Sequence, residues 1–73
     1  MYEKENGKGY LTMTLKAART NANLTLEQAS ESLHISRATL CGYENGKVSP
    51  TVDLVLKMCD LYKVGINQLN FLP

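Results

Sequence analysis

The sequence is poor in the residues that build metal sites and catalytic centres. It has one histidine, His34, and two distant cysteines, Cys41 and Cys59, with no further ligand at zinc-binding spacing. We therefore expect no metal, and we expect the two cysteines to be reduced rather than joined in a disulfide. Paired carboxylates, a nucleophile with its base and a phosphate-binding glycine loop are also missing, so neither an enzyme nor a cofactor-binding protein is expected.

Long apolar runs and a strong charge imbalance are missing as well. No segment reaches membrane-spanning length, and the first ten residues lack the apolar centre of a signal peptide. These features predict a soluble, cytoplasmic protein with no membrane partner. The formal net charge is only +1, so any surface that attracts nucleic acid must come from where the charges lie rather than from their sum.

Length and composition indicate one small globular domain. The 73 residues leave room for a single core, and a hydrophobic content of 44% is ordinary for a folded protein. Residues 1–10 are polar and are interpreted as a flexible arm ahead of a domain that spans 11–73.

Apolar residues at helical spacing predict an all-α fold. The limits of the helices are set by hydroxyl residues that can cap helix N-termini and by glycine and proline residues that end helices. We expect five helices, at about 11–22, from Thr25 to Leu33, 37–45, 51–62 and 66–70.

The second and third of these helices are joined by a tight corner, which is the layout of a DNA-reading helix-turn-helix. Thr25 and Ser36 are the caps, and Gly46 suits the left-handed position after the third helix. If Leu40 and Tyr43 face the core, the 100° step between helical neighbours turns the opposite face outward. The residues predicted to meet DNA bases there are Arg37, Ala38, Cys41 and Gly42.

The fourth helix carries two apolar strips, which is more than a small domain needs. One strip is interpreted as core and contains Val52, Val55, Leu56, Cys59 and Tyr62. The other is either a dimer surface or a broader core covered by the arm or the tail. The candidate dimer residues are Leu54, Met58 and Leu61 of this second strip, with Leu69, Phe71 and Leu72 behind it.

The chain resembles the five-helix DNA-binding domains of lambdoid phage repressors, Cro proteins and their bacterial relatives of the xenobiotic-response-element type. The resemblance covers nearly all of 11–71 and is most specific from Ile35-Ser36-Arg37 to Pro50. It implies a structural ion pair between Arg19 and Glu44. It also implies phosphate contacts, for which the candidates are Thr25, Ser36, Thr39, Asn45, Lys47, Ser49 and Thr51.

Several positions depart from the family pattern, among them the Ala29-Ser30 pair in the second helix, where the pattern usually has Leu-Ala. Leu26 stands where the pattern usually has glutamine at the first position of the second helix, which removes a phosphate contact or shifts it to Thr25. His34 replaces the corner glycine, and a histidine in left-handed geometry is uncommon but allowed.

The resemblance and the motif together predict a sequence-specific regulator of transcription, repressor-like, that binds double-stranded DNA. We expect a homodimer on a palindromic operator, with the third helix in the major groove and no small-molecule ligand. The alternative is a protein-interaction module of the same fold, antitoxin-like or antirepressor-like. The sparse reading face and the low net charge favour that alternative.

Overall fold

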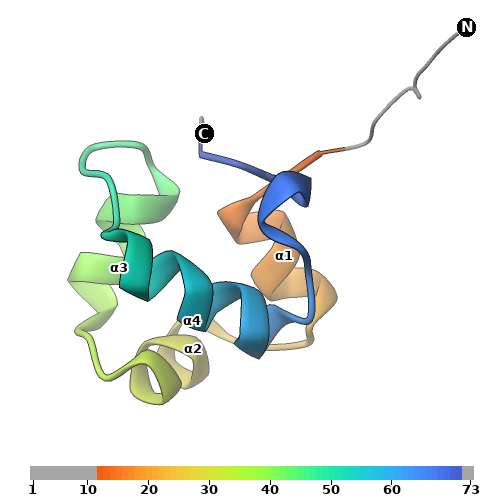
Figure 1. The fold of residues 1–73 in the computed structure, drawn as a ribbon. Coiled ribbons are helices and arrows are strands. Elements are labelled where there is room, and N and C mark those ends of the chain that lie inside the picture. Colours follow the sequence, from red (N-terminus) through yellow and green to blue (C-terminus); the bar gives the residue numbers. More distant parts are fainter. Residues whose placement is uncertain (1–11, 72–73) are drawn as a thin grey trace, which may run out of the picture.

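The computed structural model describes residues 12–71, which form four α-helices joined by short turns (Figure 1). The expected arm, 1–10, lies outside the described residues. In chain order the elements are β1 (Met13–Thr14), α1 (Leu15–Asn21), α2 (Leu26–Leu33), α3 (Arg37–Glu44), α4 (Val52–Tyr62), the 3-10 helix η1 (Ile66–Gln68) and β2 (Leu69–Asn70). The predicted all-helical character holds, apart from the two short strands.

Each α-helix begins at a hydroxyl residue whose side-chain oxygen accepts a hydrogen bond from a first-turn amide. The predicted caps of α2 and α3 are confirmed, because Thr25 accepts from the Gln28 N–H and Ser36 from the Thr39 N–H. Thr51 caps α4 in the same way. These local bonds explain why the starts of the three helices could be predicted within a residue.

The predicted start of the first helix at residue 11 is wrong. Thr14 is the N-cap of α1 and accepts a hydrogen bond of 3.1 Å from the Ala17 N–H, so the helix begins at Leu15. Leu11, Leu15, Ala18 and Ala22 are the apolar residues at helical spacing that predict a helix over 11–22. Leu15 and Ala18 are buried and Ala22 is half-buried, whereas Leu11 lies outside the described residues. Thr12 precedes the helix as irregular chain, and β1 occupies the two residues between them.

The predicted fifth helix, at 66–70, is reduced to one 3-10 turn, Ile66–Gln68, and a strand follows it at Leu69–Asn70. The side-chain oxygen Oε1 of Gln68 accepts the Gly65 N–H at 2.8 Å, which favours a single tight turn. Leu69 and Asn70 then extend and pair in parallel with Met13 and Thr14, respectively. Pairing with a segment more than fifty residues away thus replaces a continued helix.

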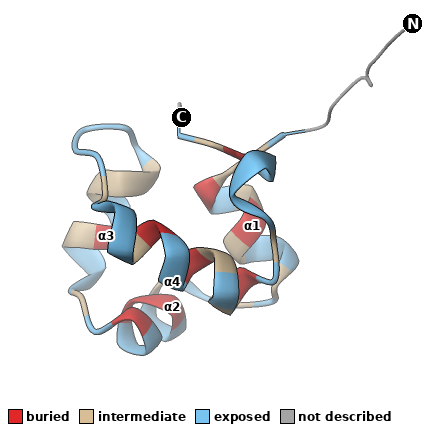
Figure 2. Ribbon diagram, in the orientation of Figure 1, coloured by how far each residue is buried: buried red, intermediate tan, exposed pale blue. Residues whose placement is uncertain are grey.

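The core lies between the facing sides of the helices, where Figure 2 shows the buried positions in red. Leu40 of α3 and Met58 of α4 are its largest fully buried side chains. The other members of the cluster are Leu15, Ala18, Ala29, Leu33, Tyr62 and Leu69. Every α-helix therefore contributes to one core, and α3 is held to it by Leu40.

The two apolar strips of α4 are placed differently from the prediction. The helix buries Val55, Met58 and Tyr62, spaced at i, i+3 and i+7. Val52 and Leu56, which were expected in the core, are 71% and 53% exposed. The sequence separates polar from apolar positions on this helix, but it does not show which apolar edge faces the other helices.

Candidate nucleic-acid interface

The corner between α2 and α3 is built by local hydrogen bonds and one unusual backbone conformation. His34 ends α2 with φ 59° and ψ 40°, the left-handed geometry that glycine usually adopts. Its N–H and that of Ile35 return to carbonyl groups of the last turn of α2, at 3.1 and 3.0 Å. His34 thus takes the place of a corner glycine, and the chain continues to Ser36, the N-cap of α3.

The outward face of α3 carries three of the four residues predicted to contact bases. Leu40 is fully buried and Tyr43 half-buried, so the side opposite them is directed to solvent. Arg37, Ala38 and Cys41 are all exposed. An arginine in the first turn of such a helix has a planar set of donors that can bind guanine or clamp a phosphate.

Gly42, the fourth of these residues, is half-buried. The side on which a side chain would lie faces the link after α3. A Cβ atom added to Gly42 would lie 3.4 Å from Cγ2 of Val48, which is an ordinary packing distance. The backbone of α3 is thus close to the 45–51 link at this point, and the link carries several of the predicted phosphate contacts.

Replacing Gly42 by alanine should stabilise the domain. Glycine costs about 1 kcal/mol relative to alanine inside a helix, and the added methyl group would pack on Val48. We expect Gly42→Ala to raise the free energy of unfolding by about 0.5–1 kcal/mol, measured by urea unfolding followed by circular dichroism. Ala38→Gly, on the exposed face of the same helix, is the matched control and should lower it similarly. A Gly42→Ala variant that is less stable than the wild type would show that the added methyl group clashes with Val48.

The residues predicted to contact phosphate lie at the start of α2, at the start of α3 and along the link between α3 and α4. Thr39 alone among them is half-buried, and its hydroxyl accepts a hydrogen bond of 2.8 Å from the Ser36 hydroxyl. The exposed ones are Thr25, Ser36, Asn45, Lys47, Ser49 and Thr51. The cap oxygens of Thr25, Ser36 and Thr51 each accept an amide hydrogen. The hydroxyl hydrogens of Thr25 and Thr51 are left for a further acceptor, whereas that of Ser36 is donated to Thr39.

One contact on this surface was not predicted. The side-chain amide of Asn45, at the end of α3, donates a hydrogen bond of 3.3 Å to the sulfur of Cys41. The two residues are four apart, a spacing that places side chains next to each other on a helix. That spacing indicates that the two side chains are neighbours, but it does not by itself indicate a hydrogen bond between them.

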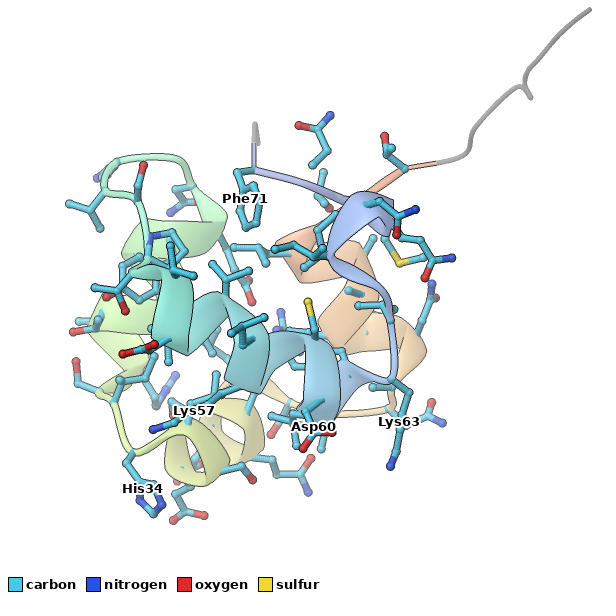
Figure 3. The ribbon with its side chains drawn as sticks, in the orientation of Figure 1. His34, Lys57, Asp60, Lys63 and Phe71 are labelled. Atoms are coloured by element: carbon cyan, nitrogen blue, oxygen red, sulfur yellow. The ribbon has the colours of Figure 1, made fainter. Side chains whose placement is uncertain are left out.

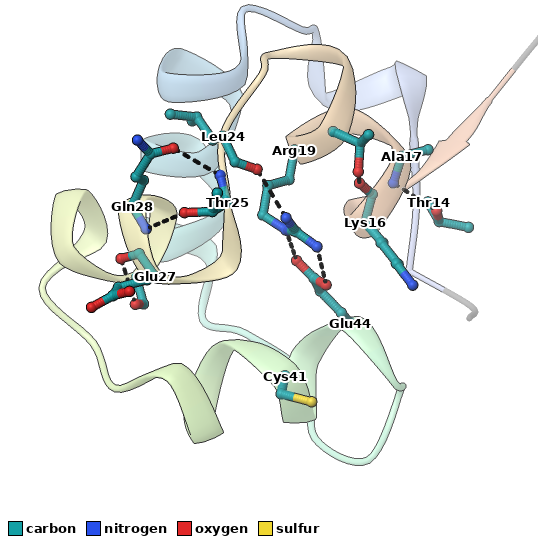
Figure 4. Close-up of polar contacts among 12 residues, drawn as sticks. Thr14, Lys16, Ala17, Arg19, Leu24, Thr25, Glu27, Gln28, Cys41 and Glu44 are labelled. Atoms are coloured by element: carbon teal, nitrogen blue, oxygen red, sulfur yellow. Dashed lines mark hydrogen bonds and ion pairs between the residues drawn. The ribbon is translucent and has the colours of Figure 1, made fainter.

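The structure brings Arg19 and Glu44 together in an ion pair that joins α1 to the end of α3 (Figure 4). Arg19 donates from Nε to Glu44 Oε2 at 2.7 Å and from Nη2 to Oε1 at 3.3 Å. The side chains are only 11% and 6% exposed, and the hydrogen bond to Glu44 raises the pKa of Arg19 against the effect of burial. Arg19 also donates to the carbonyl of Leu24 at 2.9 Å, so one guanidinium orients α3, α1 and the chain that enters α2.

The hydroxyl of Tyr62 is buried close to this ion pair. It has no hydrogen-bond partner within residues 12–71. Burial, with a smaller contribution from the negative charge of Glu44, raises the pKa of Tyr62 from 10.0 to about 12. A buried hydroxyl without a partner loses its hydration and gains no bond in return.

Tyr62→Phe should therefore be neutral at pH 7 or stabilising by up to about 1 kcal/mol. The unfolded chain loses this proton near pH 10 and the folded chain near pH 12, so ionisation favours the unfolded state between these values. We expect the wild-type free energy of unfolding to fall more steeply than that of the variant from pH 10 to 12. Urea unfolding of both proteins across this range measures the difference, and parallel curves would contradict it.

Part of the predicted dimer surface is buried, so the prediction is wrong for those residues. Met58 is fully buried and Leu69 is 7% exposed, so neither is available to a second copy, because both already pack in the core of one protomer. Leu54 and Leu61 are half-buried and also pack on that core. Phe71 is 39% exposed, and Leu72 lies outside the described residues. The exposed apolar side chains of α4 are instead Val52 and Leu56.

Outside the α3 face, the described surface includes a groove. An open groove of about 340 Å³ lies between the end of α2 and α4, lined by Ser32, Leu33, His34, Lys57, Asp60 and Leu61. His34, Lys57 and Asp60 lie along that side of the molecule in Figure 3. Across residues 12–71, no group of three or more candidate ligands could hold a metal ion. In the same part of the chain, no helix is long and apolar enough to cross a membrane.

Comparison with known proteins agrees with this geometry. The sequence pattern of a helix-turn-helix family matches residues 15–69. The HTH-type transcriptional regulator ImmR of Bacillus subtilis is 38% identical over 55 residues, covering 75% of this chain and 43% of that protein. The HTH-type transcriptional activator BcrR of Enterococcus faecalis is 34% identical over 55 residues, covering 75% of this chain and 27% of BcrR.

An archaeal relative of similar length is also found. The uncharacterised HTH-type transcriptional regulator MJ0272 of Methanocaldococcus jannaschii is 34% identical over 55 residues, covering 75% of this chain and 83% of that protein. This chain spans less than half of ImmR and BcrR, and no solved structure matches it with significance. The capped α2 and α3, their corner and the matched residues 15–69 show that the chain belongs to the Cro/C1-type helix-turn-helix family of transcriptional regulators.

Proposed function

We propose that this protein is a repressor-like transcriptional regulator that binds double-stranded DNA in a sequence-specific way, with α3 in the major groove. The observation that carries the proposal is the fixed orientation of α3. Leu40 and the Arg19–Glu44 ion pair hold one side of the helix on the protein, and Arg37 stands on the free side. The relatives' printed descriptions as transcriptional regulators support the same function.

The charge distribution supports a modest electrostatic contribution to affinity. Arg37 and Lys47 are exposed cations on the reading side, and Lys16 of α1 is exposed as well. Glu27 and Glu31 of α2 are exposed anions, which limit the attraction. Each phosphate that a cation neutralises releases counterions, so affinity should fall as salt rises. Hydroxyl and amide donors at the helix starts would then fix the register of the protein on the DNA backbone.

Arg37→Ala is the direct test of the interface. A bidentate arginine contact with guanine is worth about 1–3 kcal/mol, so the variant should bind its selected duplex about 5- to 150-fold more weakly. Fluorescence anisotropy over a range of salt concentrations measures this loss. Lys57→Ala removes an exposed cation from α4, beside the end of α2 and outside the predicted contacts, and should change affinity far less. Equal losses in the two variants would indicate only general electrostatic attraction.

A folded wild-type protein that fails to bind duplex DNA, or that binds it independently of salt, would contradict the proposal. The same result would favour the alternative role as an antitoxin-like or antirepressor-like partner of another protein. Selection of bound sites from random duplexes gives the operator and its symmetry in one experiment.

The second part of the proposal is that the protein acts as a homodimer on a palindromic operator. The exposed side chains that support it are Val52 and Leu56 on α4 and Phe71 after β2. A symmetric dimer would present its two α3 helices about 34 Å apart, to successive turns of the major groove. Sedimentation of the free and DNA-bound protein tests this part. A monomer at high micromolar concentration that also binds DNA as a single copy would overturn it.

A further inference from the structure

The outward side of α3 carries a ridge of three exposed side chains, two of them polar and the middle one a thiol. Arg37, Cys41 and Asn45 follow one another at four-residue intervals, and all three are exposed. Asn45 is the C-cap of α3, with φ −89° and ψ 0°, so its backbone continues the helical direction. The ridge therefore extends about one turn beyond Cys41, and it winds about 80° around the helix axis from Arg37 to Asn45.

Asn45 is fixed on this ridge by two hydrogen bonds to Cys41. Its backbone N–H donates to the carbonyl of Cys41 at 2.9 Å, and its side-chain Nδ2 donates to Cys41 Sγ at 3.3 Å. The second bond uses one of the two amide hydrogens. The other hydrogen and the carbonyl oxygen Oδ1 are left as an adjacent donor and acceptor.

We propose that Asn45 reads an adenine base in the major groove and that Cys41 is the positioning residue that holds its amide. This inference rests on the proposed DNA-binding function and changes the role of both residues. Asn45 was expected to contact phosphate, and Cys41 was expected to contact a base directly.

The chemistry of the free groups carries the assignment. Adenine presents an acceptor at N7 and a donor at N6 in the major groove, which match the donor and acceptor of an asparagine amide. A phosphate offers acceptors only, so a phosphate contact would use the amide hydrogen alone and leave Oδ1 to solvent. The bond to Cys41 restricts the side-chain rotamers before DNA arrives, which reduces the entropy that Asn45 loses on binding. Sulfur is a weak acceptor, so this restraint is moderate.

The test is selection of bound sites from random duplexes by the wild type and by Asn45→Ala, Cys41→Ala and Cys41→Ser. We expect one adenine position in the wild-type site whose preference falls about 5- to 150-fold in Asn45→Ala. Cys41→Ala should weaken the same preference less, and Cys41→Ser, which retains an acceptor, should preserve more of it. The double variant Cys41→Ala/Asn45→Ala should be no worse than Asn45→Ala at this position. Asn67→Ala, on the exposed surface of η1, is the matched control and should leave the site unchanged.

A phosphate role for Asn45 would give a different result. Asn45→Ala would then weaken binding to all sequences alike and leave the base preferences intact, which would overturn the proposal but not the DNA-binding function. Independent, additive effects of the two substitutions would overturn the positioning role of Cys41. A wild-type protein that enriches no duplex at all would overturn the proposed function itself, and this inference with it.

Discussion

Arg19→Ala should lower the free energy of unfolding by about 3–5 kcal/mol. The substitution leaves the Glu44 carboxylate, which is 6% exposed, without its cation, and it also removes the donor to the Leu24 carbonyl. Glu44 lies in the last turn of α3, where the helix dipole disfavours a negative charge. A domain of this size has roughly 4–11 kcal/mol of stability in total. The variant should therefore be much less stable than the wild type, as urea unfolding would show.

A double-mutant cycle separates the ion pair from the other effects of this substitution. Glu44→Gln in the Arg19→Ala background removes the unpaired buried charge and should recover part of the loss. Arg37→Ala is the matched control, because it removes an exposed arginine and should change stability by less than about 0.5 kcal/mol. Arg19→Ala would thus reduce DNA binding through the fold, and Arg37→Ala through the contact alone. Equal stability losses in the two arginine variants would contradict the structural role of Arg19.

Leu40→Ala should cost about 2–5 kcal/mol, because Leu40 is fully buried and the smaller side chain would leave a cavity. Its position on α3 means that the cavity would form directly beneath the reading face. Leu56→Ala is the same chemical change on α4 at a side chain that is 53% exposed. It should cost far less in a monomer, and thermal and urea unfolding of the two variants would compare them directly.

The Leu56→Ala control also bears on the dimer. Leu56 can be tested as an interface residue by varying the protein concentration. If it lies between two copies, Leu56→Ala should unfold like the wild type at low protein concentration, and it should be less stable than the wild type at concentrations where the wild type is dimeric. A Leu40→Ala variant as stable as Leu56→Ala would show that α3 is not anchored to the core as described.

The sequence predicts α2, α3 and the start of α4 well because their signals are local. Thr25, Ser36 and Thr51 each cap a helix through an amide three residues later, and Gly46 takes the left-handed position after α3 with φ 74°. The outward side of α3 follows from the same logic. Once Leu40 is placed in the core, helical geometry alone directs Arg37 and Cys41 to solvent.

The errors come from features that depend on the rest of the fold. A stripe of apolar residues that continued to Leu11 suggested a longer first helix, but Thr14 caps α1 and pairs with β2 instead. In α4 only Asp53, Lys57 and Asp60 are polar, so the pattern cannot distinguish Met58 from Leu56 as the inward residue. That choice is made by the positions of the neighbouring helices. The hydrogen bond between Cys41 and Asn45 depends on side-chain rotamers, which residue spacing does not specify.

The parallel pairing of β1 with β2 has a consequence for how the domain opens. Met13 pairs with Leu69 and Thr14 with Asn70, so these two short segments close a loop that contains every α-helix. The pairing spans two residues on each strand, whereas the α-helices are held together by the shared core. This clasp is therefore expected to exchange its amide hydrogens with solvent sooner than the helices do, as a separate unit of local unfolding. The α2–α3 corner lies in the middle of the enclosed loop and would keep its structure while the two ends part.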